Sequence, residues 1–149
     1  MVATALGIVL LIACLCLAYL AFRRVRLMRG GGVDVSLRRR PAGVSAPRDA
    51  SAGWHAGVAR YEGDRLAWHR LTSLRPGVSV SLDRDGLEIL DRRAPADAET
   101  YVMPAASAVL LCRSHGIDIE LAMAPGVLTG FLAWLEAAPP GRGGYRQAS

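Results

Sequence analysis

The chain has 149 residues, enough for one domain with an appendage, and its formal net charge is +5. All 18 basic residues are Arg, and the net charge is zero over residues 1–22, +6 over 23–50 and −3 over 51–140. The basic character therefore belongs to one short segment and not to the body of the chain. This distribution excludes a basic nucleic-acid-binding domain, and we expect no nucleic-acid partner.

Residues 1–22 are predicted to form a transmembrane helix. The run from Val2 to Phe22 is uncharged and apolar, and about 20 such residues cross a bilayer core as a helix. A cleaved signal peptide would carry positive charge before its apolar region, whereas here the Arg residues follow it. The positive-inside rule then predicts a single-pass protein of the cell membrane, with the N-terminus outside and the C-terminal domain in the cytoplasm.

Residues 23–52 are predicted to form an Arg-rich juxtamembrane linker. The segment contains three consecutive Gly residues at 30–32 and two prolines, Pro41 and Pro47, which disfavour a continuous helix. Arginines close to an anionic leaflet are attracted to it, and we expect contact with the lipid bilayer surface; a docking site for an acidic partner is the alternative. The predicted membrane-surface residues are Arg23, Arg24, Arg26, Arg29, Arg38, Arg39 and Arg40.

Residues 53–138 alternate between strand and turn signals and are predicted to form a cytoplasmic β domain. Gly63, Gly86 and Gly116 mark turns. Apolar and polar residues alternate over 78–82 and 117–121 and more weakly over 87–92, whereas 107–113 is apolar through its middle, as in a central strand. The expected strands are 55–61, 65–71, 78–82, 87–92, 107–113 and 117–121, with a short additional strand at 101–103.

After Pro125 the apolar period changes to that of a helix. Leu128, Phe131, Leu132 and Leu135 fall at i, i+3, i+4 and i+7 and form one stripe. This order predicts a pleckstrin-homology-like bent sheet or split barrel of about seven short antiparallel strands, capped by the C-terminal helix. A plain sandwich with a terminal helix is the alternative, and residues 139–149 are expected to be a disordered tail.

The sequence also resembles a known family over nearly its whole length. The resemblance rests on the apolar span, the Arg cluster and several short motifs: GWHxGVxRY at 53–61, RLxSLR at 70–75, GLEI at 86–89, RRAP at 92–95 and LTxFLxWLE at 128–136. These resemble an uncharacterised actinobacterial family of single-pass membrane proteins, often encoded beside the F-type ATP synthase genes. The resemblance implies a membrane protein partner, with the ATP synthase as a candidate, and implies no activity.

Motifs of enzymes and metal sites are missing from the sequence. It contains no GxSxG, P-loop, GxGxxG or HExxH motif, and its three His residues are widely spaced, so we expect no enzyme, metal or cofactor. We predict a membrane-anchored, non-enzymatic interaction module; the alternative is a domain that binds or senses anionic lipid. The candidate residues for partner or lipid contact are Arg60, Arg65, Arg70, Arg92 and Arg93.

Overall fold

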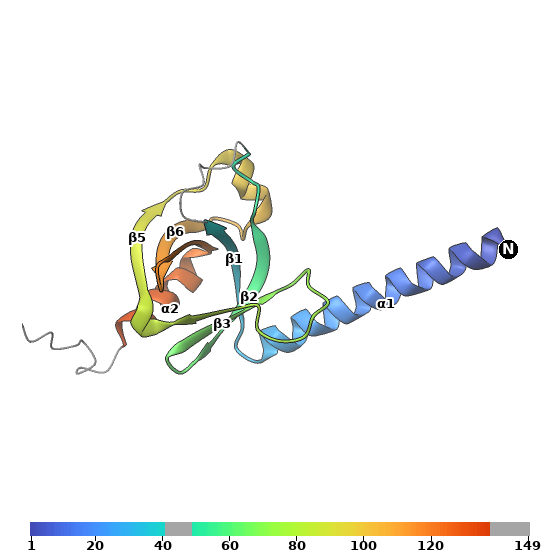
Figure 1. The fold of residues 1–149 in the computed structure, drawn as a ribbon, viewed down its shortest axis with the longest axis horizontal. Helices are drawn as coiled ribbons and strands as arrows, with labels where there is room; N and C mark the ends of the chain where they lie inside the picture. The colour runs from blue at the N-terminus through green and yellow to red at the C-terminus, as the bar shows by residue number, and fades with distance from the viewer. Residues whose placement is uncertain (41–48, 138–149) are drawn as a thin grey trace, which may run out of the picture.

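The computed structural model describes residues 1–40 and 49–137. Helix α1 (Val2–Arg29) projects from a curled half-barrel sheet of seven antiparallel strands, and a second helix, α2 (Pro125–Glu136), follows the last strand (Figure 1). This arrangement confirms the predicted apolar helix, bent sheet and C-terminal helix. The strands are β1 (Val33–Arg40), β2 (His55–Glu62), β3 (Arg65–Arg70), β4 (Val80–Asp83), β5 (Leu87–Arg93), β6 (Ala108–Ser114) and β7 (Ile117–Met123).

Helix α1 is longer than the predicted span. It continues from the apolar run through the Arg cluster to Arg29, because no Gly or Pro occurs between Phe22 and Gly30. An 18-residue window of α1 has a mean hydropathy of 2.7 and is not buried against the domain, so α1 is long and apolar enough to span a membrane. The chain turns at Gly31, whose φ is +83°, and Gly32 packs too closely against Val58 and Leu27 to carry a side chain.

Residues 33–40 correct the prediction of a linker. They form β1, which lies in the middle of the sheet order β4-β3-β2-β1-β7-β6-β5 and pairs with both β2 and β7. Val35 and Leu37 are each 2% exposed, while Asp34 and Ser36 occupy the alternating positions. The linker prediction was wrong here because the three Arg residues at 38–40 concealed a strand of otherwise regular alternation.

The expected short strand at 101–103 is absent from the structure. Tyr101 and Val102 are instead the last two residues of a 3-10 helix, Asp97–Val102. At the start of this helix the Glu99 carboxylate accepts a hydrogen bond from the backbone N–H of Ala96 at 2.8 Å. The seventh strand is therefore β1 and not residues 101–103. The predicted tail at 139–149 lies outside the described residues.

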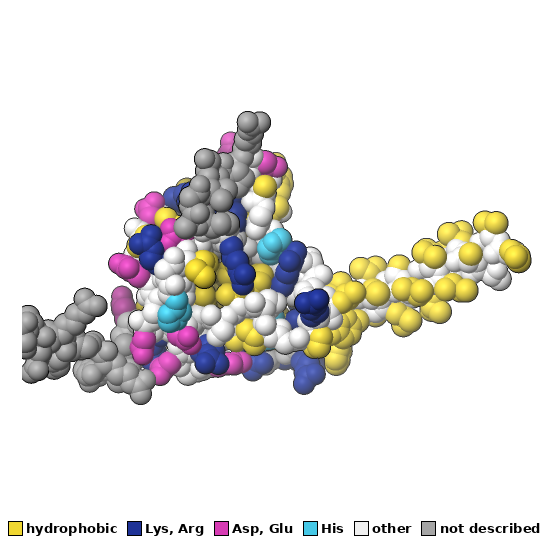
Figure 2. Space-filling model, in the orientation of Figure 1, with side chains coloured by type: hydrophobic (Ala, Val, Ile, Leu, Met, Phe, Trp, Pro, Cys, Tyr) yellow, Lys and Arg dark blue, Asp and Glu magenta, His cyan; other side chains and the backbone are white. Residues whose placement is uncertain are grey.

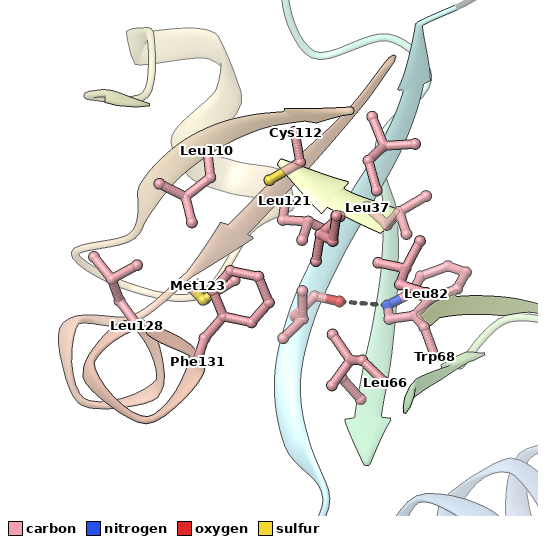
Figure 3. Close-up of a cluster of buried hydrophobic side chains, with 14 residues drawn as sticks. Leu37, Leu66, Trp68, Leu82, Leu110, Cys112, Leu121, Met123, Leu128 and Phe131 are labelled. Atoms are coloured by element: carbon pink, nitrogen blue, oxygen red, sulfur yellow. Dashed lines mark hydrogen bonds between the residues drawn. The ribbon is translucent and has the colours of Figure 1, made fainter. Parts of the chain in front are cut away.

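The core fills the concave side of the sheet and is closed by α2 (Figure 3). Leu128 and Phe131 of α2 are 4% and 1% exposed, as the predicted stripe requires. Trp134 anchors the same helix to the β2–β3 turn, because its indole N–H donates to the Gly63 carbonyl at 2.8 Å. On the opposite part of the core, the Trp68 indole N–H donates to the Val35 carbonyl at 2.8 Å and ties β3 to β1.

Candidate functional site

A groove of about 530 Å³ lies where α1 meets the β domain. The last turns of α1 form one wall, and β2, β3 and the loop between β3 and β4 (residues 71–79) form the other. We call it the juxtamembrane groove. Its walls include Tyr19, Phe22, Arg23 and Arg26 from the helix and Arg60, His69, Pro76 and Gly77 from the domain.

Polar contacts hold the domain against the end of α1. The guanidinium of Arg23 donates through Nη1 to the backbone carbonyls of Arg70 at 3.0 Å and Ser73 at 2.6 Å, which fixes the 71–79 loop against the helix. Arg24, one residue further along, forms an ion pair with Asp34 of β1 at 3.1 Å. The position of the groove is therefore set by the helix and the sheet together.

Two other arginines of the groove keep their guanidinium groups available. Within the described part of the chain, the side chains of Arg26 and Arg60 have no hydrogen-bond or ion-pair partner. The Arg60 guanidinium lies against the end of α1, where a Cβ at Gly30 would come within 3.2 Å of its Cζ. Among the described residues no acidic side chain lines the groove, so the guanidinium groups of Arg23, Arg26 and Arg60 give it a positive charge.

His69 contributes a buried polar atom to the groove wall. The side chain is 8% exposed, and its Nδ1 lies 2.9 Å from the Gly77 carbonyl oxygen. Because a carbonyl only accepts, Nδ1 carries the proton of this hydrogen bond. The other ring nitrogen, Nε2, is buried without a hydrogen-bond partner among the described residues.

The 71–79 loop that closes the groove carries exposed apolar side chains. Leu74 is 58% exposed and Val78 is 50% exposed, although the loop belongs to an otherwise well-packed domain. The loop projects beside α1 (Figure 1). Figure 2 shows basic side chains gathered near the base of α1, with the acidic ones mainly on the side away from it.

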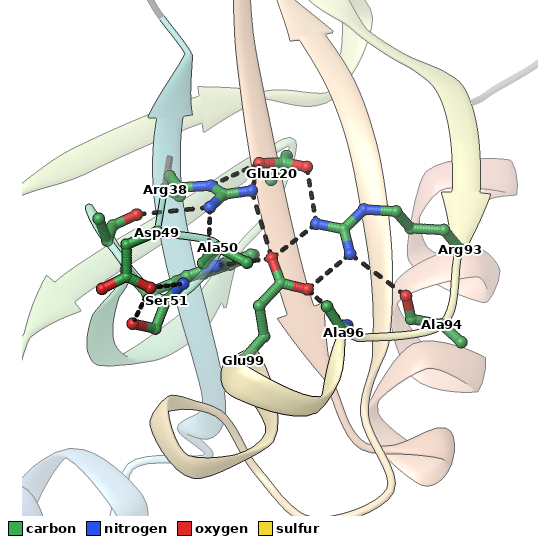
Figure 4. Close-up of polar contacts among 11 residues, drawn as sticks. Arg38, Asp49, Ala50, Ser51, Arg93, Ala94, Ala96, Glu99 and Glu120 are labelled. Atoms are coloured by element: carbon green, nitrogen blue, oxygen red, sulfur yellow. Dashed lines mark hydrogen bonds and ion pairs between the residues drawn. The ribbon is translucent and has the colours of Figure 1, made fainter. Parts of the chain in front are cut away.

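A second polar cluster lies inside the domain and consists of two arginines and two glutamates (Figure 4). Arg38 of β1 donates through Nε to Glu120 of β7 at 2.6 Å and through Nη2 to Glu99 at 3.3 Å. Arg93 of β5 binds Glu99 through both terminal nitrogens, at 2.6 and 2.8 Å, and reaches Glu120 at 3.1 Å. We call this set the Arg–Glu network.

The electrostatics of the Arg–Glu network indicate a structural role. Hydrogen bonds from Arg93 are the main cause that lowers the pKa of Glu99 to about 2, assisted by the Ala96 N–H and the Trp54 indole N–H. The same pairing raises the pKa of Arg93 above its usual range. Both carboxylates accept hydrogen bonds from the two arginines, and the network joins β1, β5 and β7.

The predicted membrane-surface arginines divide between two environments. Arg23, Arg24, Arg26 and Arg29 lie on the last two turns of α1, Arg39 is exposed on β1 and Arg40 is half-buried. Arg38 corrects the prediction: it is 7% exposed and belongs to the Arg–Glu network. A guanidinium held between two buried carboxylates cannot also contact lipid head groups.

The five arginines proposed for partner or lipid contact are also dispersed. Only Arg60 lies in the juxtamembrane groove. Arg65 pairs with Asp83 at 3.3 Å, Arg70 donates to Thr72 at 3.1 Å, Arg92 is exposed on β5, and Arg93 belongs to the Arg–Glu network. Sequence reasoning missed His69, Glu99 and Glu120, because nothing local signals that they converge with distant arginines.

A second hollow, of about 410 Å³, opens into the concave side of the sheet. Leu37, Trp68 and Val80 form its apolar floor, and Arg39, His55 and Arg70 lie among its polar walls. Partial desolvation, assisted by the charge of Arg70, lowers the pKa of His55. The residues that line this hollow all come from the β domain and none comes from α1. One of its two arginines, Arg70, already donates a hydrogen bond to Thr72.

Comparisons with known proteins identify relatives along almost the entire chain. The model of a family described as a protein of unknown function (DUF2550) matches residues 9–141. An uncharacterized protein of Mycobacterium tuberculosis is 39% identical over 147 residues, covering 95% of this chain and 96% of the relative. An uncharacterized protein of Mycobacterium leprae is 37% identical over 147 residues, which cover 95% of this chain and 96% of that relative. No solved structure matches the chain.

Proposed function

Because the chain belongs to the DUF2550 family, whose function is unknown, we propose a function from its geometry: a membrane-anchored, non-enzymatic interaction module. In this proposal α1 crosses the cell membrane with its N-terminus outside, and the β domain lies at the cytoplasmic surface. The four arginines on the last two turns of α1 support this orientation through the positive-inside rule.

The close attachment of the domain to α1 is the observation that carries the proposal. Three glycines at 30–32 separate α1 from the central strand β1, and three residues span at most about 10 Å. Arg23 and Arg24 add direct hydrogen bonds and an ion pair between the helix and the domain. The domain would thus present one defined face to a neighbouring membrane protein, and anchoring would raise its local concentration there.

The partner in this proposal is a membrane protein, and the resemblance noted above makes a bioenergetic complex such as the F-type ATP synthase the first candidate. The test is photo-crosslinking in native membranes, with crosslinkable residues at the exposed positions Tyr101 and Ile117. We expect the full chain to capture one membrane protein reproducibly. Recovery of lipid alone would refute the proposed function.

A chain that begins at Gly30 is the matched control for this experiment, because it keeps all seven strands and lacks α1. Effective concentration through anchoring is typically worth a factor of about 100 or more, so the control should capture the same protein far less efficiently. Equal yields from both chains would show that anchoring contributes nothing to the interaction.

The orientation has a separate test. A reporter that is active only in the cytoplasm, fused after Ser149, should be active, and a reporter that requires export should be silent. Replacing Arg23, Arg24, Arg26 and Arg29 together should weaken this orientation. Activity of the exported reporter on the unmodified chain would overturn the assignment.

A further inference from the structure

We propose that the juxtamembrane groove binds the phosphate head group of an anionic phospholipid from the leaflet next to the β domain. This inference rests on the proposed passage of α1 through the membrane and deepens the function proposed above by naming a ligand. It concerns Arg26 and Arg60 together, which no local sequence motif connects.

The groove lies at the depth of the phosphates. The uncharged part of α1 ends at Phe22, and a helix of that length fills a hydrocarbon core of about 30 Å. The head-group layer adds roughly 5–8 Å on each side, which corresponds to about three to five helical residues. Arg23 and Arg26 therefore lie within this layer. The Arg60 guanidinium beside Gly30 lies about 6 Å further along the helix axis, at the aqueous side of the layer, and lines the same groove.

The charge of the groove is complementary to a phosphate. Arg23 uses its Nη1 on the carbonyls of the 71–79 loop, whereas the guanidinium groups of Arg26 and Arg60 have no partner among the described residues. A guanidinium binds phosphate with two parallel hydrogen bonds. Elsewhere in the domain, by contrast, Arg38, Arg93 and others are neutralised by carboxylates.

The surroundings of the groove favour a lipid over a free phosphate or a phosphorylated peptide. Tyr19 and Phe22 extend its wall into the apolar part of α1, where an acyl chain would continue from a bound head group. Leu74 and Val78 are exposed on the loop that Arg23 holds against the helix. Those side chains would lose contact with water if the loop entered the lipid interface.

His69 supplies the remaining polar group. It is 92% buried, lines the groove, and its Nε2 has no hydrogen-bond partner within the described residues. With Nδ1 donating to the Gly77 carbonyl, a neutral His69 offers an acceptor at Nε2. A hydroxyl group of a bound head group could donate to it.

The test uses the full chain in vesicles of phosphatidylcholine that contain a small fraction of fluorescently labelled phosphatidylglycerol. All three Trp residues lie in the β domain, so energy transfer from Trp to the label reports lipid next to the domain. We expect stronger transfer to phosphatidylglycerol than to identically labelled phosphatidylcholine, and competition by unlabelled phosphatidylglycerol. Displacement of the labelled lipid by millimolar inorganic phosphate would assign the groove to free phosphate and overturn the proposal.

Arg60→Gln and Arg92→Gln form a matched pair, because each removes one charge from a strand of the domain and only Arg60 lies in the groove. An arginine at a lipid surface contributes about a fivefold change in binding. Arg60→Gln should weaken the competition by unlabelled phosphatidylglycerol about fivefold, and the double variant Arg26→Gln, Arg60→Gln should weaken it about 25-fold. Arg92→Gln should weaken it by less than twofold. Equal losses for Arg60→Gln and Arg92→Gln would indicate general attraction to the surface and refute the proposal.

The Trp emission spectrum of each variant shows whether the domain remains folded, and Arg26→Gln alone provides a second test outside the domain. Because the vesicles contain no other protein, this experiment fails or succeeds independently of the crosslinking experiment. If energy transfer shows no preference for phosphatidylglycerol while crosslinking still captures a protein partner, only the inference of a lipid site is refuted.

Discussion

Replacing Arg38 by Met should destabilise the β domain strongly. Arg38 is 7% exposed, and its guanidinium donates to Glu120 at 2.6 Å, Glu99 at 3.3 Å and the Ala50 carbonyl at 2.7 Å. Without it, the one ion pair that Glu120 keeps within residues 1–40 and 49–137 is that with Arg93 at 3.1 Å. Breaking a buried ion pair costs about 3–5 kcal/mol, and the remaining Arg93 contacts place the expected loss near the lower end, at about 3 kcal/mol.

The assay is urea unfolding of the full chain in detergent micelles, followed by Trp fluorescence, because α1 contains no Trp. With a urea dependence of about 1–3 kcal/mol per molar, the loss should lower the midpoint by roughly 1–3 M. Arg65→Met is the control, since the Arg65–Asp83 pair is exposed and such pairs contribute about 0–1 kcal/mol. Glu120→Gln should partly rescue Arg38→Met, because it removes one of the two carboxylate charges that Arg93 alone would otherwise have to balance. Equal midpoints for Arg38→Met and Arg65→Met would refute this account and return Arg38 to the membrane-facing set.

Three further predictions concern the same domain. The pKa of Glu99 is lowered from 4.5 to about 2 in the folded chain. The ionised Glu99 therefore stabilises the fold fully above the unfolded pKa, and this stabilisation is lost as the pH falls from about 4.5 towards 2. Urea midpoints measured across this pH range should fall more steeply for the parent chain than for Glu99→Gln. A chain that begins at Gly30 should give the dispersed amide NMR spectrum of a folded domain, whereas residues 50–149 should not, because they lack the central strand β1. Phe131→Ala should cost about 3–5 kcal/mol because the side chain is 1% exposed, while the exposed Glu136→Ala should leave the thermal unfolding midpoint nearly unchanged.

Local signals in the sequence predicted most of the fold. Gly63 and Gly116 adopt positive φ angles of 64° and 80° in the turns where they were expected, and each turn joins two antiparallel neighbours, β2 with β3 and β6 with β7. The stripe on α2 was equally clear, since helical periodicity is a property of neighbouring residues. These elements needed no knowledge of distant contacts.

The errors arose where a residue's environment depends on distant parts of the chain. Arg38 resembled the other arginines after the membrane span, and only its pairing across β1 and β7 places it beside Glu120. The juxtamembrane groove was equally hidden, because Arg26 and Arg60 are 34 positions apart in the sequence. Charge patterning identified the arginines that follow the apolar helix, but it could not distinguish those with a carboxylate partner from those without one.

The position of β1 also determines when the domain can fold during synthesis. β1 is the first strand to follow α1, yet one of its two neighbours is β7, the last strand: Val35 pairs with Met123 and Arg40 with Asp118. Contacts of such high sequence separation slow folding, and here the central strand leaves the ribosome long before its second partner. The proposed insertion of α1 into the membrane would therefore begin while the sheet is still incomplete, and a chain truncated before β7 would leave β1 with an unpaired edge.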